Sequence, residues 1–311
     1  MKRAAVILGI LTLVITSVAV WAEAQSSTQP APQNPPAAGQ AAPAQATTQG
    51  AAAAPTGKRP PQAKTQPEFD AYNAAAAITD PVILEKTSDD FAAKYPDSEI
   101  RILLYQRAMR LYLNANNDEK AEAMGRKVLS LDGDDPEALA TVAEMIAERT
   151  HDSDLDRDQR YAEAISMAQK STQTVDTDLR IQSGTPQEKI DASKAGLRAW
   201  AYSTIGSIEF KKENYRAAQE NLQKSIDALP SNPDAVVVLR LALAIDKEAT
   251  AAVDQGKKDK LYAEALKVAD RAVGMTQDNT AIGTPARRER DRLQKLTEGT
   301  ATAQPQSPPK N

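Results

Sequence analysis

The sequence predicts an all-α fold in which antiparallel helix pairs stack one after another. Its 311 residues are 41% hydrophobic but only 4% aromatic, and 26% are charged. This composition is typical of helices that pack through small and aliphatic side chains. From residue 67 onward, apolar residues recur at i, i+3 and i+4, which indicates one buried face per helix. Similar segments repeat along the chain, and such units stack because none can bury its apolar face alone.

The first 24 residues have the plan of a signal peptide. A basic start at Lys2 and Arg3 precedes an uncharged apolar run through Ala22, and Ala22 and Ala24 supply the small residues of a cleavage site. An uncleaved signal anchor is the alternative, because the run nearly reaches the ~20 residues of a spanning helix. In both cases the basic end predicts that the rest of the chain is exported. We expect it in the periplasm, or anchored to the inner membrane and facing the periplasm.

Residues 25–66 are rich in Ala, Pro, Gln, Thr and Gly and lack large apolar side chains. No core can then offset the entropy of ordering them, so we expect a disordered linker. The tail 298–311 has the same character. The linker is either a spacer or Pro-rich ligand for a partner, or a solvated leader without specific contacts. Lys58 and Arg59 are isolated in it and do not make a basic patch.

The helical domain is predicted to cover residues 67–297. It opens with a helix over Pro67–Ile78, and a second helix has Thr79 or Asp80 as its N-cap and Pro81 at its first position. The next pair lies between residues 99 and 136, and Asn116-Asn117 break it. The expected buried stripe of its first helix consists of Tyr105, Ala108, Met109 and Tyr112. Later helices are expected over residues 136–150, 161–172, from about 186 into 200–233, 233–253, 261–275 and 284–296, with polar insertions at 151–160 and about 173–185 and a loop at 254–260.

Three short segments recur at equivalent places. Tyr161-Ala-Glu-Ala164 and Tyr262-Ala-Glu-Ala265 are identical, and Tyr215-Arg-Ala-Ala218 is a third copy. In each, we expect the tyrosine to start the second helix of a pair and to fill the gap at the turn. The alanine one helical turn later lets the helix backbones approach closely.

These units resemble the tetratricopeptide repeat, a 34-residue helix–turn–helix. The best copy carries the pattern at Tyr202, Ile205-Gly206, Tyr215, Ala218, Leu222 and Pro230. The unit from Ile102 carries it at Tyr105, Tyr112, Ala121 and Val128, but has Met109 where Gly is usual and Asp118 where Tyr is usual. The resemblance covers roughly residues 67–275. It implies a right-handed superhelix, an α-solenoid of about five helix pairs with a closing helix.

The resemblance also implies that the first helix of each pair lines a concave face that binds a protein or an extended peptide. The corresponding positions here are Gln106, Arg110, Asn114, Glu144, Glu148, Ser203, Ser207 and Lys211. This face is polar and of mixed charge, so a non-catalytic scaffold or adaptor of the cell envelope is the first hypothesis. The second is a membrane-anchored structural subunit that uses the linker and the convex surface. Charge reversal at Arg110 and Lys211 is expected to discriminate between them.

The chain has no Cys and a single His, His151. Disulfides, thiolate catalysis and multi-His metal sites are therefore excluded, and no cofactor or enzymatic site is indicated. A net charge of -4 argues against a nucleic-acid-binding surface. The alternating acids from Asp152 to Asp158, with Glu163 at the twelfth position, imitate a calcium-binding loop. Arg157 stands where that loop needs Gly, and a solvated acidic loop is the alternative. The sequence indicates no oligomeric state.

Overall fold

The computed structural model describes residues 58–182, 184–277 and 280–302, and within them it contains eleven α-helices. Their bounds are α1 Gln66–Ala76, α2 Pro81–Lys94, α3 Arg101–Asn114, α4 Asp118–Leu131, α5 Pro136–Arg149, α6 Arg157–Thr174, α7 Gln187–Lys211, α8 Tyr215–Ala228, α9 Ala235–Ala251, α10 Gln255–Gly274 and α11 Gly283–Thr302. The predicted signal segment 1–24, the linker up to residue 57 and the end of the tail lie outside the described residues.

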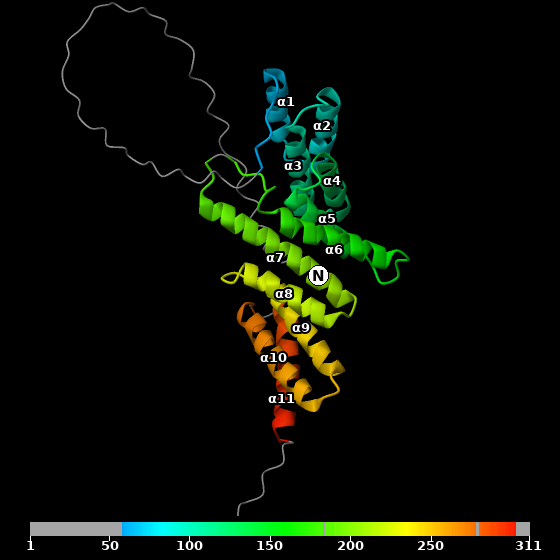
Figure 1. Ribbon diagram of the computed structural model, residues 1–311, viewed down its shortest axis with the longest axis vertical. Coiled ribbons are helices and arrows are strands. Elements are labelled where there is room, and N and C mark those ends of the chain that lie inside the picture. Colours follow the sequence, from blue (N-terminus) through cyan, green and yellow to red (C-terminus); the bar gives the residue numbers. More distant parts are fainter. Residues whose placement is uncertain (1–57, 183, 278–279, 303–311) are drawn as a thin grey trace, which may run out of the picture.

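Consecutive helices pack as pairs, and the pairs follow one another along an elongated stack (Figure 1). The pairs are α1 with α2, α3 with α4, α5 with α6, α7 with α8 and α9 with α10, and α11 closes the stack against α10. The prediction of an all-α stack of about five helix pairs and a closing helix is confirmed in the described residues. Within the described residues, no helix is long and apolar enough to cross a membrane.

Several helices begin where an Asp or Asn side chain caps the backbone. The Asp80 carboxylate accepts from Val82 N and Ile83 N, and Pro81 takes the first helical position, as predicted. Asn117, Asp135 and Asp254 cap the starts of α4, α5 and α10 in the same manner. Each such cap stabilises its helix by about 1 kcal/mol, because it satisfies backbone N–H groups that have no partner inside the helix.

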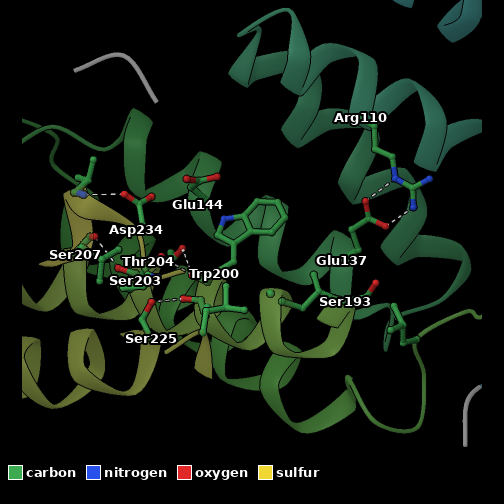
Figure 2. A pocket seen from close by; sticks show the side chains of 18 of the residues that line it. Arg110, Glu137, Glu144, Ser193, Trp200, Ser203, Thr204, Ser207, Ser225 and Asp234 are labelled. Atoms are coloured by element: carbon green, nitrogen blue, oxygen red, sulfur yellow. Dashed lines mark hydrogen bonds and ion pairs between the residues drawn. The ribbon is translucent and has the colours of Figure 1, made fainter. Parts of the chain in front are cut away.

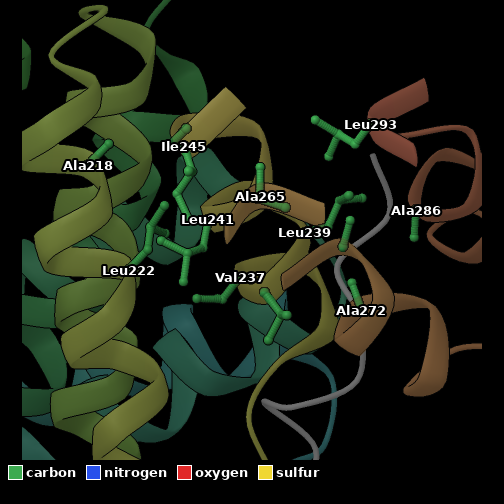
Figure 3. Close-up of a cluster of buried hydrophobic side chains, with 14 of the residues drawn as sticks. Ala218, Leu222, Val237, Leu239, Leu241, Ile245, Ala265, Ala272, Ala286 and Leu293 are labelled. Carbon is green, nitrogen blue, oxygen red and sulfur yellow. The ribbon is translucent and has the colours of Figure 1, made fainter. Parts of the chain in front are cut away.

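Small residues allow close contact between the helices of a pair, as the repeat pattern predicts. Ala121, Ala164, Ala218 and Ala265 are fully buried, each on the second helix of its pair. Figure 3 shows Ala218 and Ala265 in the cluster that joins the last two pairs. Tyr105, Tyr112, Tyr161 and Tyr262 are also buried, whereas Tyr202 and Tyr215 are half-buried and Pro230 is exposed.

On α3, Met109 stands where the repeat pattern usually has glycine, and a glycine on the neighbouring helix α4 faces it. Met109 is fully buried. A Cβ added at Gly125 would lie 3.3 Å from the Met109 sulfur and 2.6 Å from Val142 Cγ2. Gly125 therefore leaves room mainly for Val142 on α5 and also for the Met109 sulfur, so a small residue stands on the helix that faces Met109.

Three predicted boundaries differ from the structure by four residues or more. Helix α6 begins at Arg157 and α10 at Gln255, so Tyr161 and Tyr262 lie inside their helices and the predicted loop 254–260 is almost entirely helical. Helix α10 starts early because the Asp254 carboxylate accepts from Lys257 N at 2.6 Å. Helix α11 runs to Thr302, five residues beyond the predicted domain end at 297.

The last residues of the predicted linker are packed against the stack, contrary to the expectation of disorder up to residue 66. Lys58 Nζ lies 2.7 Å from Asp132 Oδ1 and 3.3 Å from Asp178 Oδ1, and its backbone forms an isolated parallel bridge with Arg180. Arg59 pairs with Glu99 at 2.9 Å. We call residues 58–65 the strap. Composition alone missed it because its contacts are ionic and involve residues far away in sequence.

Candidate functional site

A cavity of about 620 Å³ runs along the first helices of four successive pairs, α3, α5, α7 and α9. We call it the groove (Figure 2). Parts of the connection between α6 and α7, of the strap and of residues 281–285 complete its lining. Because the lining comes from successive pairs, the groove exists only in the assembled stack.

Seven of the eight predicted partner-binding residues line the groove. They are Gln106 and Arg110 on α3, Glu144 and Glu148 on α5, and Ser203, Ser207 and Lys211 on α7. Asn114 does not line it. Asn114 is the last residue of α3 and is exposed.

The groove also has an extensive apolar lining that the sequence did not reveal. Trp200, Leu197 and Ile190 come from α7, and Val236 and Leu239 from α9. From the sequence we expect the large apolar residues of the helices to lie in the core, and the segment before α7 to be a polar insertion. The available signal was the length of the α7 pattern, which places Trp200 one and two turns before Ser203 and Ser207 on the same face. The lining is therefore both apolar and polar, whereas the sequence predicted a polar face.

At the α3 end, the charged residues of the groove are fixed by partners in the protein itself. The Arg110 guanidinium pairs with both carboxylate oxygens of Glu137, and Nε donates at 2.6 Å (Figure 2). Gln106 donates to Asp135 Oδ2 at 2.7 Å. Arg180 pairs with both Asp132 and Asp135. Burial raises the pKa of the Asp135 carboxyl, and the neighbouring Glu137 carboxylate adds to this rise.

At the other end, α5, α7 and α9 bring a second set of charged groups together. Lys211 Nζ donates to the carbonyl oxygen of Ala147 at 2.7 Å, and Arg240 donates to Ser207 Oγ. Desolvation lowers the pKa of Lys211, and the Glu148 carboxylate opposes this shift. The cations here thus contact neutral oxygens, while carboxylates lie close enough to influence them.

The serine hydroxyls along α7 are occupied by the helix backbone. Ser203 Oγ donates to Trp200 O at 2.8 Å, and Ser207 Oγ donates to Ser203 O at 2.7 Å. His151, the single imidazole of the chain, lies in the connection between α5 and α6 and does not line the groove. The groove therefore presents shape, apolar surface and charge to a binding partner.

The acidic segment 152–163 does not form a twelve-residue loop, because its second half belongs to α6. Asp154 accepts from His151 N at 2.9 Å and lies 3.3 Å from Arg160, while Asp158 pairs with Arg157. Among the described residues, no group of three or more His, Cys, Asp or Glu side chains is placed to hold a metal ion.

Together the fold and the groove define a class: a protein of stacked helix pairs with a groove of mixed apolar and charged lining. No protein-family model matches the chain, and no curated protein matches it. Solved structures are similar at low scores. Two are crystal structures of MamA, each 15% identical, with TM-scores of 0.32 and 0.30; they cover 67% and 61% of this chain and 98% and 95% of their own. The third is the assembly chaperone of RpL4, Acl4, which is 12% identical with a TM-score of 0.37 and covers 75% of this chain and 99% of its own. At such scores the likeness carries no argument about function, so the class rests on the helix pairs themselves.

Proposed function

We propose that this chain is a non-catalytic adaptor that binds an extended segment of a protein partner in the groove. The observation that carries the proposal is the groove itself, about 620 Å³ in volume and lined by four successive pairs. An extended peptide suits it better than a compact ligand, because α7 alone is about 38 Å long. Apolar side chains from the partner would pack against Trp200 and Leu239, and polar groups would meet the charges at either end.

The groove is held in shape before any partner arrives. Arg110 is paired with Glu137, and Arg180 with Asp132 and Asp135, so the side chains of the α3 end are fixed across helix boundaries. Binding to a preorganised surface loses little conformational entropy on the protein side. Recognition of this kind depends on shape and anchor residues more than on induced folding.

Charge reversal at Arg110 and Lys211, which the sequence suggested as a way to distinguish the groove from the convex surface, is unsuitable. Reversing Arg110 would leave Glu137 beside a second carboxylate in a half-buried site, which destabilises the stack itself. Glu148 is exposed and lines the groove, so Glu148→Lys changes the groove with little structural cost. Ser203→Arg fills the groove beside Trp200. Glu264→Lys is the matched control, because Glu264 is exposed on α10 and does not line the groove.

A random peptide library displayed on phage supplies the probe. We expect wild-type protein to select peptides with Kd values near the micromolar range, and Ser203→Arg and Glu148→Lys to weaken them at least tenfold. Glu264→Lys should bind like wild type. Equal binding by all four proteins would place recognition outside the groove.

We further propose that the protein acts outside the cytoplasm, with the N-terminal segment as its export signal or anchor. The basic start and apolar run of residues 1–24 support this proposal. Edman sequencing of the protein from its native cell tests it: a chain that begins at Gln25 shows cleavage, and an intact Met1 in a membrane fraction shows an anchor. A cytoplasmic chain with an intact Met1 would contradict export.

The second candidate, a membrane-anchored structural subunit that uses the linker and the convex surface, is favoured by one observation. The strap fixes the end of the linker to the stack through Lys58, so a tether would be coupled to the folded domain. In that case Glu264→Lys or other changes on the second helices would disturb assembly, whereas Ser203→Arg would not.

A further inference from the structure

The ionisable side chains that line the groove are close to charge balance. They are five carboxylates, on Asp135, Glu137, Glu144, Glu148 and Asp234, and four cations, on Arg110, Arg180, Lys211 and Arg240. Most of the charge at the α3 end is already neutralised by ion pairs within the protein. A strongly charged segment would gain little from such a surface and would lose its hydration there. An uncharged segment fits it better.

The chain itself contains such a segment. Residues 25–57 hold no Asp, Glu, Lys, Arg or His, and they include Pro30, Pro32, Pro35, Pro36, Pro43 and Pro55. Pro-rich sequences favour the extended polyproline II conformation and dock into grooves lined by aromatic residues. Trp200 is the aromatic residue of this groove, and apolar side chains of α7 and α9 accompany it. The composition of the segment and the lining of the groove are therefore complementary.

The segment also joins the described part of the chain at the edge of the groove. Pro60 and Pro61 of the strap line the groove, and Lys58 is held by Asp132 and Asp178. Residue 57 is three residues before Pro60, and three residues of extended chain span about 10 Å. The segment therefore begins within about 10 Å of the groove lining. In the polyproline II conformation residues 25–57 would span roughly 100 Å, more than twice the ~38 Å length of α7.

We propose that the groove binds residues 25–57 of the same molecule, so that the chain's own linker competes with the partner. This inference rests on the proposed function, since it names an occupant of the same groove. A segment tethered so close has an effective concentration in roughly the millimolar range, so even an intrinsic Kd of about 0.1 mM keeps the groove mostly occupied. A partner must then displace the linker. The apparent affinity of the partner falls by about tenfold, the ratio of the linker's effective concentration to its Kd.

Photocrosslinking in the full chain tests this occupant. p-Benzoylphenylalanine in place of Glu148 puts the probe on exposed groove lining, and the same residue in place of Glu119 gives the control. Both sites lie about 20 Å along their helices from the corner between α4 and α5, where Asp132 binds Lys58: Glu148 is 13 residues from Asp135, and Glu119 is 13 residues from Asp132. No Lys or Arg occurs between Arg3 and Lys58, so trypsin releases the whole segment as one peptide that ends at Lys58.

The expected result is a crosslink between position 148 and that peptide, at least tenfold stronger than from position 119. In a mixture of isotopically light and heavy chains, each crosslink should join peptides of one isotopic type. Equal crosslinking from the two positions, no crosslink, or crosslinks of mixed isotopic type would each overturn the proposal.

A second variant separates this inference from the proposed function. Full-length protein with all six linker prolines changed to Ser should lose the crosslink and bind the phage-selected peptides several-fold more tightly. If the selected peptides crosslink at position 148 but the linker does not, the groove binds peptides and the named occupant is wrong. If neither crosslinks there, both proposals fail.

Discussion

Gly206 on α7 is the position where the close approach of two helices can be tested with a single methyl group. A Cβ added at Gly206 would lie 2.7 Å from Leu222 Cγ, 2.9 Å from Leu222 Cδ2 and 3.1 Å from Leu222 N on α8. Carbon atoms in contact prefer about 3.5–4.0 Å, so the Gly206→Ala variant must push α8 away or force Leu222 from its rotamer. Leu222 is fully buried and cannot move into solvent.

Two effects of opposite sign determine the magnitude. Replacing Gly by Ala inside a helix stabilises it by up to about 1 kcal/mol, because Ala has the higher helix propensity. Overpacking a filled core costs roughly 1–3 kcal/mol. We therefore expect Gly206→Ala to lower the free energy of unfolding by about 1 kcal/mol, which corresponds to a fall in Tm of about 2–4 °C for a domain of this size.

Urea denaturation followed by far-UV circular dichroism measures this effect. Gly274→Ala is the matched control, because a Cβ at Gly274, the last residue of α10, has nothing within 4 Å. The control should be neutral or more stable than wild type. If Gly206→Ala proves as stable as Gly274→Ala, the result would contradict the close contact between α7 and α8 at Gly206.

The remaining predictions concern other elements of the stack. Ala218→Leu, at a fully buried position on α8, should cost roughly 1–3 kcal/mol of stability in the same urea assay; unchanged stability would contradict the packing of this pair. Glu213 has φ 62°, so Glu213→Gly should raise the free energy of unfolding by about 0.5–1 kcal/mol, and a lower free energy of unfolding would argue against the left-handed turn. Burial, together with the hydrogen bond to Asp89, raises the pKa of Tyr105 to about 12. The stability this provides is complete below pH ~10, the unfolded value, and is lost as pH rises toward 12, so Tyr105→Phe should weaken the pH dependence between these limits. Lys58→Met should speed tryptic cleavage after Lys64, and an unchanged rate would mean that Lys58 does not hold the strap.

The stack of helix pairs could be predicted from sequence because its signals are local. Helical periodicity, Pro81 at a helix start and Ala218 one turn after Tyr215 each depend on neighbours within a few residues. The starts of α6 and α10 were misplaced because the repeat pattern suggested a tyrosine at the first position. In the structure, the Asp254 side chain starts α10 well before Tyr262.

The groove was only partly predictable. The helix face that carries Ser203 and Ser207 followed from the repeat register, but the ion pair between Arg110 and Glu137 links separate helices and has no local signature. The apolar lining around Trp200 was missed for a related reason. A tryptophan on a helix face has the same pattern whether it lies in a core or beside a cavity, and only the packing of α5, α7 and α9 decides which.

The strap gives the molecule an unusual point of attachment. A force applied to the N-terminal end of the chain reaches Lys58 before it reaches α1, and Lys58 is bound to Asp132 at the corner between α4 and α5. The pull is therefore carried by the middle of the stack, and α1 and α2 remain unloaded while these ion pairs hold. Once they break, the load passes to the Arg59–Glu99 pair and then to the start of α1, whose pair shares an apolar core with the second pair. The strap thus sets the order in which the stack would come apart under tension.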